Sequence, residues 1–168
     1  MPTLSPNWSN LEKDLTTKLS EYQKTHRNDL KYRGPYHSIL KETESGEKCT
    51  DGFRSDGLLT NGKFLLAIEV EAGQTHSDTN VGKYWFIQTQ YKFEKIVLFH
   101  IYTPKHNSYP HRKELANFYA EKMKHEGIPI EYIPKTYTAG DAPEYHEVLD
   151  EVWKLKLQKI TILFPPEG

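Results

Sequence analysis

The fold is decided by the stretch Arg54–Glu71, which reads RSDGLLTNGKFLLAIEVE. Two apolar runs flank Asn61 and Gly62, and both of these residues tolerate the positive φ angles of a two-residue type I′ turn. We therefore expect a β-hairpin with strands over 52–59 and 63–71. A two-residue loop would place Asp56 opposite Ala67.

Three carboxylates are expected to meet on one face of this hairpin. Side chains alternate between the faces of a strand, so Glu69 and Glu71 share a face with Ala67, and Asp56 lies on it diagonally to Glu69. The run Phe64–Ile68 is apolar on both faces, which is typical of a buried central strand where unpaired carboxylates are unfavourable. Such oxygen ligands suit Mg²⁺ or Mn²⁺. The alternative is a half-exposed hairpin whose acidic face meets water.

The hairpin resembles the catalytic hairpin of the PD-(D/E)XK nuclease superfamily, the fold of many type II restriction endonucleases. In that family an Asp on one strand and an acidic-x-Lys triplet on the next bind a divalent metal. Asp56 matches the first Asp, with Ser55 in place of the usual Pro, and Glu69 matches the acidic residue. Glu71 stands where the Lys is expected, as in some restriction enzymes of this type. The resemblance covers residues 50–105 and implies Mg²⁺-dependent phosphodiester hydrolysis, in DNA or, as the alternative, in RNA.

Composition bounds the class of protein. A chain of 168 residues with 36% hydrophobic and 27% charged residues predicts one restriction-endonuclease-like domain over residues 1–168. No run approaches the ~20 apolar residues of a membrane span, and the start lacks the features of a signal peptide, so we expect no membrane association. Cys49 is the only cysteine, which excludes an internal disulfide and favours a cytoplasmic location. The net charge of −1 argues against coating nucleic acid through bulk charge.

Hydrophobic periodicity predicts the remaining elements. Strand 95–102 is expected beside 63–71 and parallel to it, because a helix between them makes a right-handed crossover. Strand 128–133 is expected at the sheet edge because it contains Pro129. The fold class is thus α/β, with a mixed central sheet of about four to six strands flanked by helices. Helices are predicted over 7–26, 80–92, 111–126 and 143–158, and an apolar strand-like tail over 160–164.

Further side chains are candidates for the site. Lys83, on the helix after the second hairpin strand, can point back over the carboxylates and replace the missing motif Lys, or it is a solvated helix residue. Glu12 borders the apolar stripe of the first helix, from which the resemblance implies that an acidic residue can reach the metal; the alternative, a solvated helix residue, is the one the pattern favours. Weaker candidates for contact with nucleic acid are Gln74 and His76 after the strand, and Lys105, Tyr109 and Arg112 in a basic, Pro-bounded segment.

The sequence favours a metal-dependent endonuclease. Asp56 and Glu69 would ligate Mg²⁺, and Glu71 would be a second ligand or orient the attacking water. Lys83 would supply positive charge near the phosphate. One alternative is a nucleic-acid-binding module that keeps the fold without catalysis, and another is a protein-interaction subunit with an aromatic-rich surface. A homodimer would let two sites cut both strands, and assembly with a partner subunit is the other arrangement.

Overall fold

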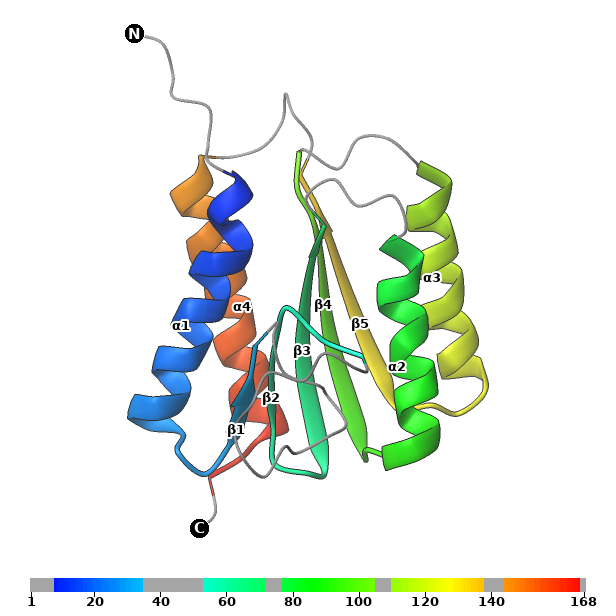
Figure 1. The fold of residues 1–168 in the computed structure, drawn as a ribbon, viewed down its shortest axis with the longest axis horizontal. Helices are drawn as coiled ribbons and strands as arrows, with labels where there is room; N and C mark the ends of the chain where they lie inside the picture. The colour runs from blue at the N-terminus through cyan, green and yellow to red at the C-terminus, as the bar shows by residue number, and fades with distance from the viewer. Residues whose placement is uncertain (1–7, 35–52, 72–76, 105–109, 138–143, 167–168) are drawn as a thin grey trace, which may run out of the picture.

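A five-stranded mixed sheet with helices on both faces forms the centre of the computed structural model (Figure 1). The expected α/β class is therefore confirmed. The structure describes residues 8–34, 53–71, 77–104, 110–137 and 144–166. Along the chain the elements are η1 (Trp8–Asn10), α1 (Leu11–His26), β1 (Lys31–Arg33), β2 (Gly57–Thr60), β3 (Phe64–Glu71), α2 (Ser77–Tyr91), β4 (Lys95–Tyr102), α3 (Pro110–His125), β5 (Ile130–Thr136) and α4 (Tyr145–Leu163).

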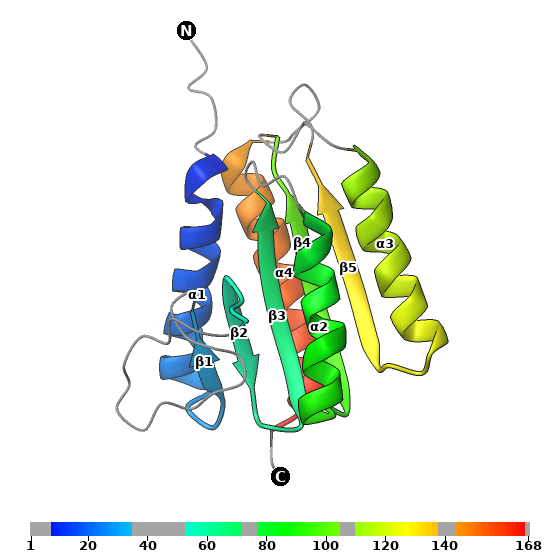
Figure 2. The same cartoon turned by 45° about the vertical axis from the view of Figure 1, so that its right-hand side comes forward.

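The strands lie in the order β1-β2-β3-β4-β5. β1, β2 and β3 pair antiparallel, whereas β3, β4 and β5 run parallel (Figure 2). The predicted parallel pairing of 63–71 with 95–102 is confirmed, and so is the edge position of the strand after Pro129. Because β3, β4 and β5 share one direction, their carboxyl ends meet at one edge of the sheet.

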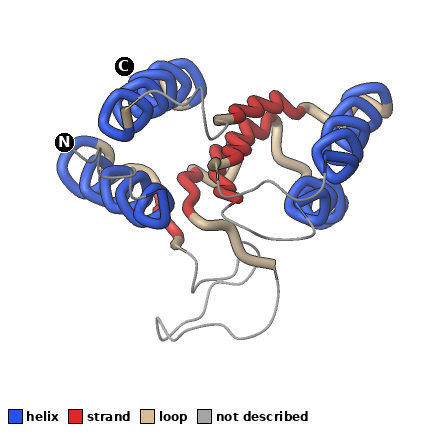
Figure 3. The backbone as a smooth tube through the Cα atoms, turned by 90° about the horizontal axis from the view of Figure 1, so that it is seen from above, coloured by secondary structure: helices blue, strands red, loops and turns tan. Residues whose placement is uncertain are grey.

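The sheet separates two helical layers. α1 and α4 cover one face and α2 and α3 cover the other (Figure 3). On β3, Leu66, Ile68 and Val70 belong to the core under α1 and α4, whereas Leu65 and Ala67 belong to the core under α2 and α3. This burial on both faces explains why the strand is apolar up to Ile68. Within the described ranges, no helix combines the length and the apolar character needed to cross a membrane.

The hairpin register differs by two residues from the one expected. Thr60 pairs with Leu65, so the expected opposition of Asp56 and Ala67 is wrong. Continuing the observed register by one residue beyond β2 brings Asp56 opposite Glu69. A shift by two leaves each side chain on its predicted face, because side chains alternate with a period of two.

The turn itself explains this difference. Asn61 accepts the backbone N–H of Lys63 (3.0 Å) and of Phe64 (2.8 Å) with its side-chain Oδ1. Only Gly62 in this turn has a positive φ, 88°, whereas a type I′ turn needs two such residues. The Asn61 side chain therefore closes a wider, Asx-type turn in place of the two-residue loop.

The last helix is longer than predicted, and the expected strand-like tail over 160–164 is wrong. α4 continues to Leu163, and the backbone N–H of Phe164 donates to the carbonyl of Ile160 (2.9 Å). The reason is a stripe of buried residues at spacings of three and four, which continues through the tail and packs on the sheet. Its members are Val148, Val152, Lys156, Ile160 and Leu163.

Lys156 is the one charged residue of that stripe. Its side chain is fully buried (0% exposed), and Nζ has no hydrogen-bond partner among the described residues. The ammonium lies 6.0 Å from the centroid of the Phe99 ring and 5.7 Å from that of Trp153. Burial lowers the pKa of Lys156 to about 7. The folded protein therefore binds this proton less tightly than the unfolded chain does.

Replacing Lys156→Met should stabilise the protein in a pH-dependent manner. The cost of the buried ammonium is full below pH 7 and disappears as the pH rises towards 10.5, the value of an exposed lysine. We expect the free energy of unfolding to rise by on the order of 1–4 kcal/mol at pH 6 and by little at pH 10. Urea denaturation at both pH values measures this, with the exposed Lys154→Met on the same helix as control. An equal gain at both pH values would contradict the interpretation.

Candidate functional site

The three predicted carboxylates lie near the carboxyl end of β3, on the face covered by α2. Glu69 and Glu71 are 2% and 0% exposed. Asp56 precedes β2, and its Oδ2 accepts the backbone N–H of Val70 (2.7 Å). This bond continues the β2–β3 pairing through a side chain and fixes Asp56 beside the two glutamates. Ligands of α/β sheets commonly bind at this edge, beyond the carboxyl ends of the strands.

Glu69 is held by two side chains of α2. Lys83 Nζ lies 2.5 Å from Glu69 Oε1, and the Tyr84 hydroxyl donates to the same oxygen (2.6 Å). The Lys83 ammonium also donates to the backbone carbonyl of Arg54 (2.6 Å) and to Asn80 Oδ1 (3.2 Å). Lys83 is thus a buried bridge between α2, β3 and the segment before β2, and the alternative of a solvated helix residue is wrong.

Glu71 is oriented by α2 and by the neighbouring strands. Its Oε1 accepts hydrogen bonds from Asn80 Nδ2 (2.6 Å) and from His100 Nε2 (2.7 Å). His100 is fully buried on β4, and its Nδ1 lies 2.7 Å from the Tyr132 hydroxyl of β5. The Tyr102 hydroxyl lies 3.2 Å from the same Nδ1. The position of Glu71 therefore depends on three separate elements.

Among the described residues, the site brings one lysine ammonium to three carboxyl groups. Burial raises the pKa of Glu69 to about 7, with the Lys83 ammonium opposing the rise and the Asp56 charge adding to it. Burial also raises the pKa of Asp56, against the Val70 N–H and the Lys83 charge, and the Glu71 charge raises it further. One ammonium is therefore insufficient for three carboxylates that are removed from water.

Glu12 approaches the same site from α1. Burial raises the pKa of its half-buried carboxyl to about 6, and the charge of Asp56 adds to the rise. Glu12 is therefore a further acidic group whose charge acts on the site through Asp56.

The carboxylate oxygens of the site are the type of ligand that a hard divalent cation prefers. In the part of the chain that the structure describes, no three His, Cys, Asp or Glu side chains are already arranged around a common point. Asp56, Glu69 and Glu71 nevertheless offer only oxygen donors and an excess of negative charge, which is what Mg²⁺ or Mn²⁺ requires. Glu69 would have to exchange its contact with Lys83 for the ion.

Of the weaker candidates, only Arg112 lies within the described residues. Its guanidinium, on α3, donates to Asp78 Oδ1 of α2 (3.2 Å), and the Asp78 side chain is 7% exposed. Arg112 thus joins the first turns of the two helices near the carboxyl edge of the sheet. Gln74, His76, Lys105 and Tyr109 lie outside the described residues.

Sequence reasoning missed the residues that position the carboxylates. His100 is a single polar residue within the apolar run Lys95–Tyr102, and in the parallel register its Cα partner is Glu69. Because a buried polar group needs a hydrogen-bond partner, a histidine in such a strand points to an acid on the neighbouring one. Asn80 carries no comparable signal, since asparagine is common at the start of a helix.

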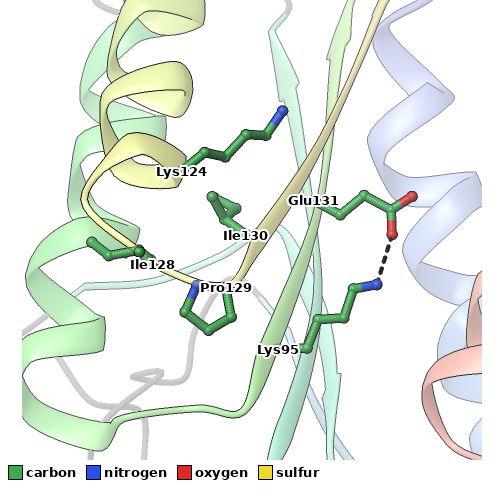
Figure 4. Close-up of a pocket in the computed structure, with 7 residues that line it drawn as sticks. Lys95, Lys124, Ile128, Pro129, Ile130 and Glu131 are labelled. Atoms are coloured by element: carbon green, nitrogen blue, oxygen red, sulfur yellow. Dashed lines mark ion pairs between the residues drawn. The ribbon is translucent and has the colours of Figure 1, made fainter.

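A surface pocket at the opposite end of the parallel strands is a different kind of site (Figure 4). Glu131 there pairs with Lys95 (3.3 Å) and also with Lys159. The acidic group is thus already neutralised by lysines, and the pocket holds a single carboxylate. Its lining residues are Lys95, Lys124, Gly127, Ile128, Pro129, Ile130 and Glu131.

Comparisons of the chain with protein-family models, with curated proteins and with solved structures give no match. In its described part, the structure defines a class of site: an acidic cluster with one lysine, at the carboxyl edge of a mixed α/β sheet. The function is therefore argued from the chemistry of that cluster.

The raised pKa of Glu69 predicts that the effect of Glu69→Gln on the stability of the metal-free protein depends on pH and is more favourable at alkaline pH. Glu69 ionises near pH 4.5 when unfolded and near 7 when folded, so its contribution to stability falls as the pH rises through this range. The variant should gain on the order of 1–3 kcal/mol more in unfolding free energy at pH 8 than at pH 5. Guanidinium denaturation with EDTA measures the gain, and the exposed Glu114→Gln is the control. An effect of Glu69→Gln that is equal at pH 5 and pH 8, or less favourable at pH 8, would refute the raised pKa of Glu69.

Proposed function

We propose that the protein is a metal-dependent endonuclease that hydrolyses phosphodiester bonds in DNA, and that it is related to the PD-(D/E)XK nucleases. The observation that carries the proposal is the convergence of Asp56, Glu69 and Glu71 in one buried site with Lys83. The order of strands supports it as well. An antiparallel hairpin, a helix and a parallel strand follow each other as the resemblance implies. A cytoplasmic location belongs to the same proposal.

The carboxylates would hold Mg²⁺ or Mn²⁺. When bound, the ion would make a coordinated water more acidic and offset charge on the phosphate. Asp56 is suited to be a fixed ligand because Val70 holds one of its oxygens. Glu71 is suited to be a second ligand or to orient the attacking water, because Asn80 and His100 fix its carboxylate.

Lys83 would take the place of the missing motif lysine. The motif position on β3 holds Glu71, but an ammonium reaches the same site from α2, 2.5 Å from Glu69 Oε1. A cation at this point would stabilise negative charge that develops on the phosphate during attack. The lysine is thereby separated from the acidic strand in sequence and adjacent to it in space.

Asp56→Asn should reduce Mg²⁺-dependent cleavage of plasmid DNA by on the order of 100-fold or more, since it removes a charged ligand. The amide retains an oxygen that can accept the Val70 N–H, so the fold is expected to persist. Agarose-gel assays with and without EDTA measure the cleavage. Asp150→Asn, at an exposed position of α4, should cleave like the wild type. Cutting that survives Asp56→Asn would overturn the site assignment.

The second candidate is a binding module that keeps the fold and lacks the chemistry. The observation that favours it is the state of Glu69, whose Oε1 is already occupied by Lys83 and Tyr84. In such a protein the ion pair would be a structural bridge between α2 and β3. DNA binding or protein interaction would then not depend on a divalent ion.

Calorimetric titration with Mn²⁺ separates the two candidates. The endonuclease should show saturable heat that Asp56→Asn reduces by about 10- to 100-fold in affinity. Glu131→Gln, which alters the acidic group of the distant pocket, is the matched control and should bind Mn²⁺ like the wild type. Absence of heat, with and without DNA, would favour the binding module and contradict the proposed hydrolysis.

A further inference from the structure

Two phenylalanine rings form an exposed aromatic pair on the α2 side of the molecule. Phe53 is 39% exposed and Phe86 is 49% exposed. Their ring centroids are 5.4 Å apart with the planes tilted by 57°. Large apolar side chains usually turn away from water, so two of them in contact on the surface indicate a binding surface. We call these two residues the Phe53–Phe86 pair.

The pair borders the acidic site. Phe53 directly precedes Arg54, whose backbone carbonyl accepts the Lys83 ammonium (2.6 Å). That same ammonium lies 2.5 Å from Glu69. Phe86 follows Lys83 by three residues on α2, which is about 4.5 Å along the helix axis. Phe53 is thus next to Arg54 in the sequence, and Phe86 lies about one helical turn from Lys83. Arg54 and Lys83 contact one another.

The chemistry of this surface fits nucleobases. Aromatic rings stack on the faces of bases without regard to their identity, because every base has a π-face. The side chain of Arg54 is exposed beside Phe53, and a guanidinium there can contact the phosphate of the stacked nucleotide or stack on its base. A phenylalanine ring has no hydrogen-bonding group, so the surface offers stacking without readout of sequence.

The stacking geometry selects single strands over duplex. Bases within a duplex are stacked on one another, and their faces are accessible only where the strand is unpaired or the base is flipped out. The net charge of −1 leaves little bulk attraction for the backbone of either a single strand or a duplex. Stacking must then supply much of the affinity.

We infer that the Phe53–Phe86 pair binds unpaired nucleobases and that the strand presented to the carboxylates is single-stranded. This inference rests on the proposed endonuclease function, because it names the substrate of that same site. A strand stacked on the pair lies beside Arg54, whose backbone carbonyl accepts the Lys83 ammonium. The bond to be cut is therefore expected a short distance from the stacked base.

The test uses an oligonucleotide that carries 2-aminopurine, whose fluorescence falls when the base stacks. The full chain is titrated, in Ca²⁺ and without Mg²⁺, into the single strand and into the same strand annealed to its complement. The wild type should quench the single strand and bind it at least about tenfold more tightly than the duplex. Phe53→Leu and Phe86→Leu should each weaken single-strand binding about tenfold. Phe86→Trp keeps an aromatic ring at this position and should bind the single strand like the wild type.

Phe118→Leu is the matched control, since Phe118 is 54% exposed on α3. It should bind like the wild type, and circular dichroism checks that every variant is folded. Quenching that is unchanged in both Phe53→Leu and Phe86→Leu, or equal binding of single strand and duplex, would overturn the inference. A change from dimer to monomer in these variants, without oligonucleotide binding by the wild type, would show a subunit interface and would overturn it too.

Cleavage with Mg²⁺ is scored separately on the same variants. Quenching that depends on the Phe53–Phe86 pair, without cleavage by the wild type, supports the inference and refutes the endonuclease. Cleavage by the wild type that is equal in Phe53→Leu, Phe86→Leu and Phe118→Leu, on single strands and duplexes alike, supports the endonuclease and refutes the inference.

Discussion

The contact between Lys83 and Glu69 holds the candidate site together. It joins α2 to the carboxyl end of β3, and the same ammonium fixes the segment that leads into β2 through the carbonyl of Arg54. Both side chains are nearly removed from water, at 8% and 3% exposed. A buried ion pair is weak evidence for stability, because apolar residues of similar volume are often as stable or more so. We therefore explain the Lys83–Glu69 pair by its role in the acidic site and not by a contribution to folding stability.

The face of β3 under α2 changes character along its length. At Leu65 and Ala67 it belongs to a hydrophobic core, and at Glu69 and Glu71 the same face becomes acidic. The parallel strand β4 changes in step, from Leu98 to His100. The apolar part gives the sheet its rigidity, and the polar part begins where the parallel strands end. Catalytic and binding groups are held most accurately on such rigid elements.

Most of the fold could be predicted from the sequence, because hydrophobic periodicity depends on which faces are buried. The alternation along β3 put Glu69 and Glu71 on the correct face, and a register shift of two residues left that result intact. The register itself could not be predicted, since it follows from hydrogen bonds of the Asn61 side chain within the turn. The end of α4 was missed because an apolar run such as Ile160–Phe164 has no strong period of its own.

Part of the site could also be predicted from the sequence pattern. Asp56, Glu69 and Glu71 are close because they lie on adjacent strands, and this follows from the hairpin signal. The contacts of Glu71 with Asn80 and His100 depend on how α2 and β4 lie against β3, and periodicity does not give that arrangement. The role of Lys83 was inferred because phosphodiester hydrolysis needs a positive charge near the phosphate and the motif lysine is missing. The helix pattern did not indicate it. Requirements of chemistry can thus find a residue that local patterns leave unmarked.

Two buried lysines show why the acidic site points to a ligand. Lys156, on the buried face of α4, lies near aromatic rings, and the sheet separates it from the carboxylates, so its cost has no compensation in the described structure. Lys83 has the opposite environment, with more carboxylates around it than it can neutralise. A cation that binds only the folded state returns stability to such a site in proportion to its occupancy. The charge imbalance at Asp56, Glu69 and Glu71 is therefore the reason for proposing a divalent ion at this site, whereas Lys156 has no hydrogen-bond partner among the described residues.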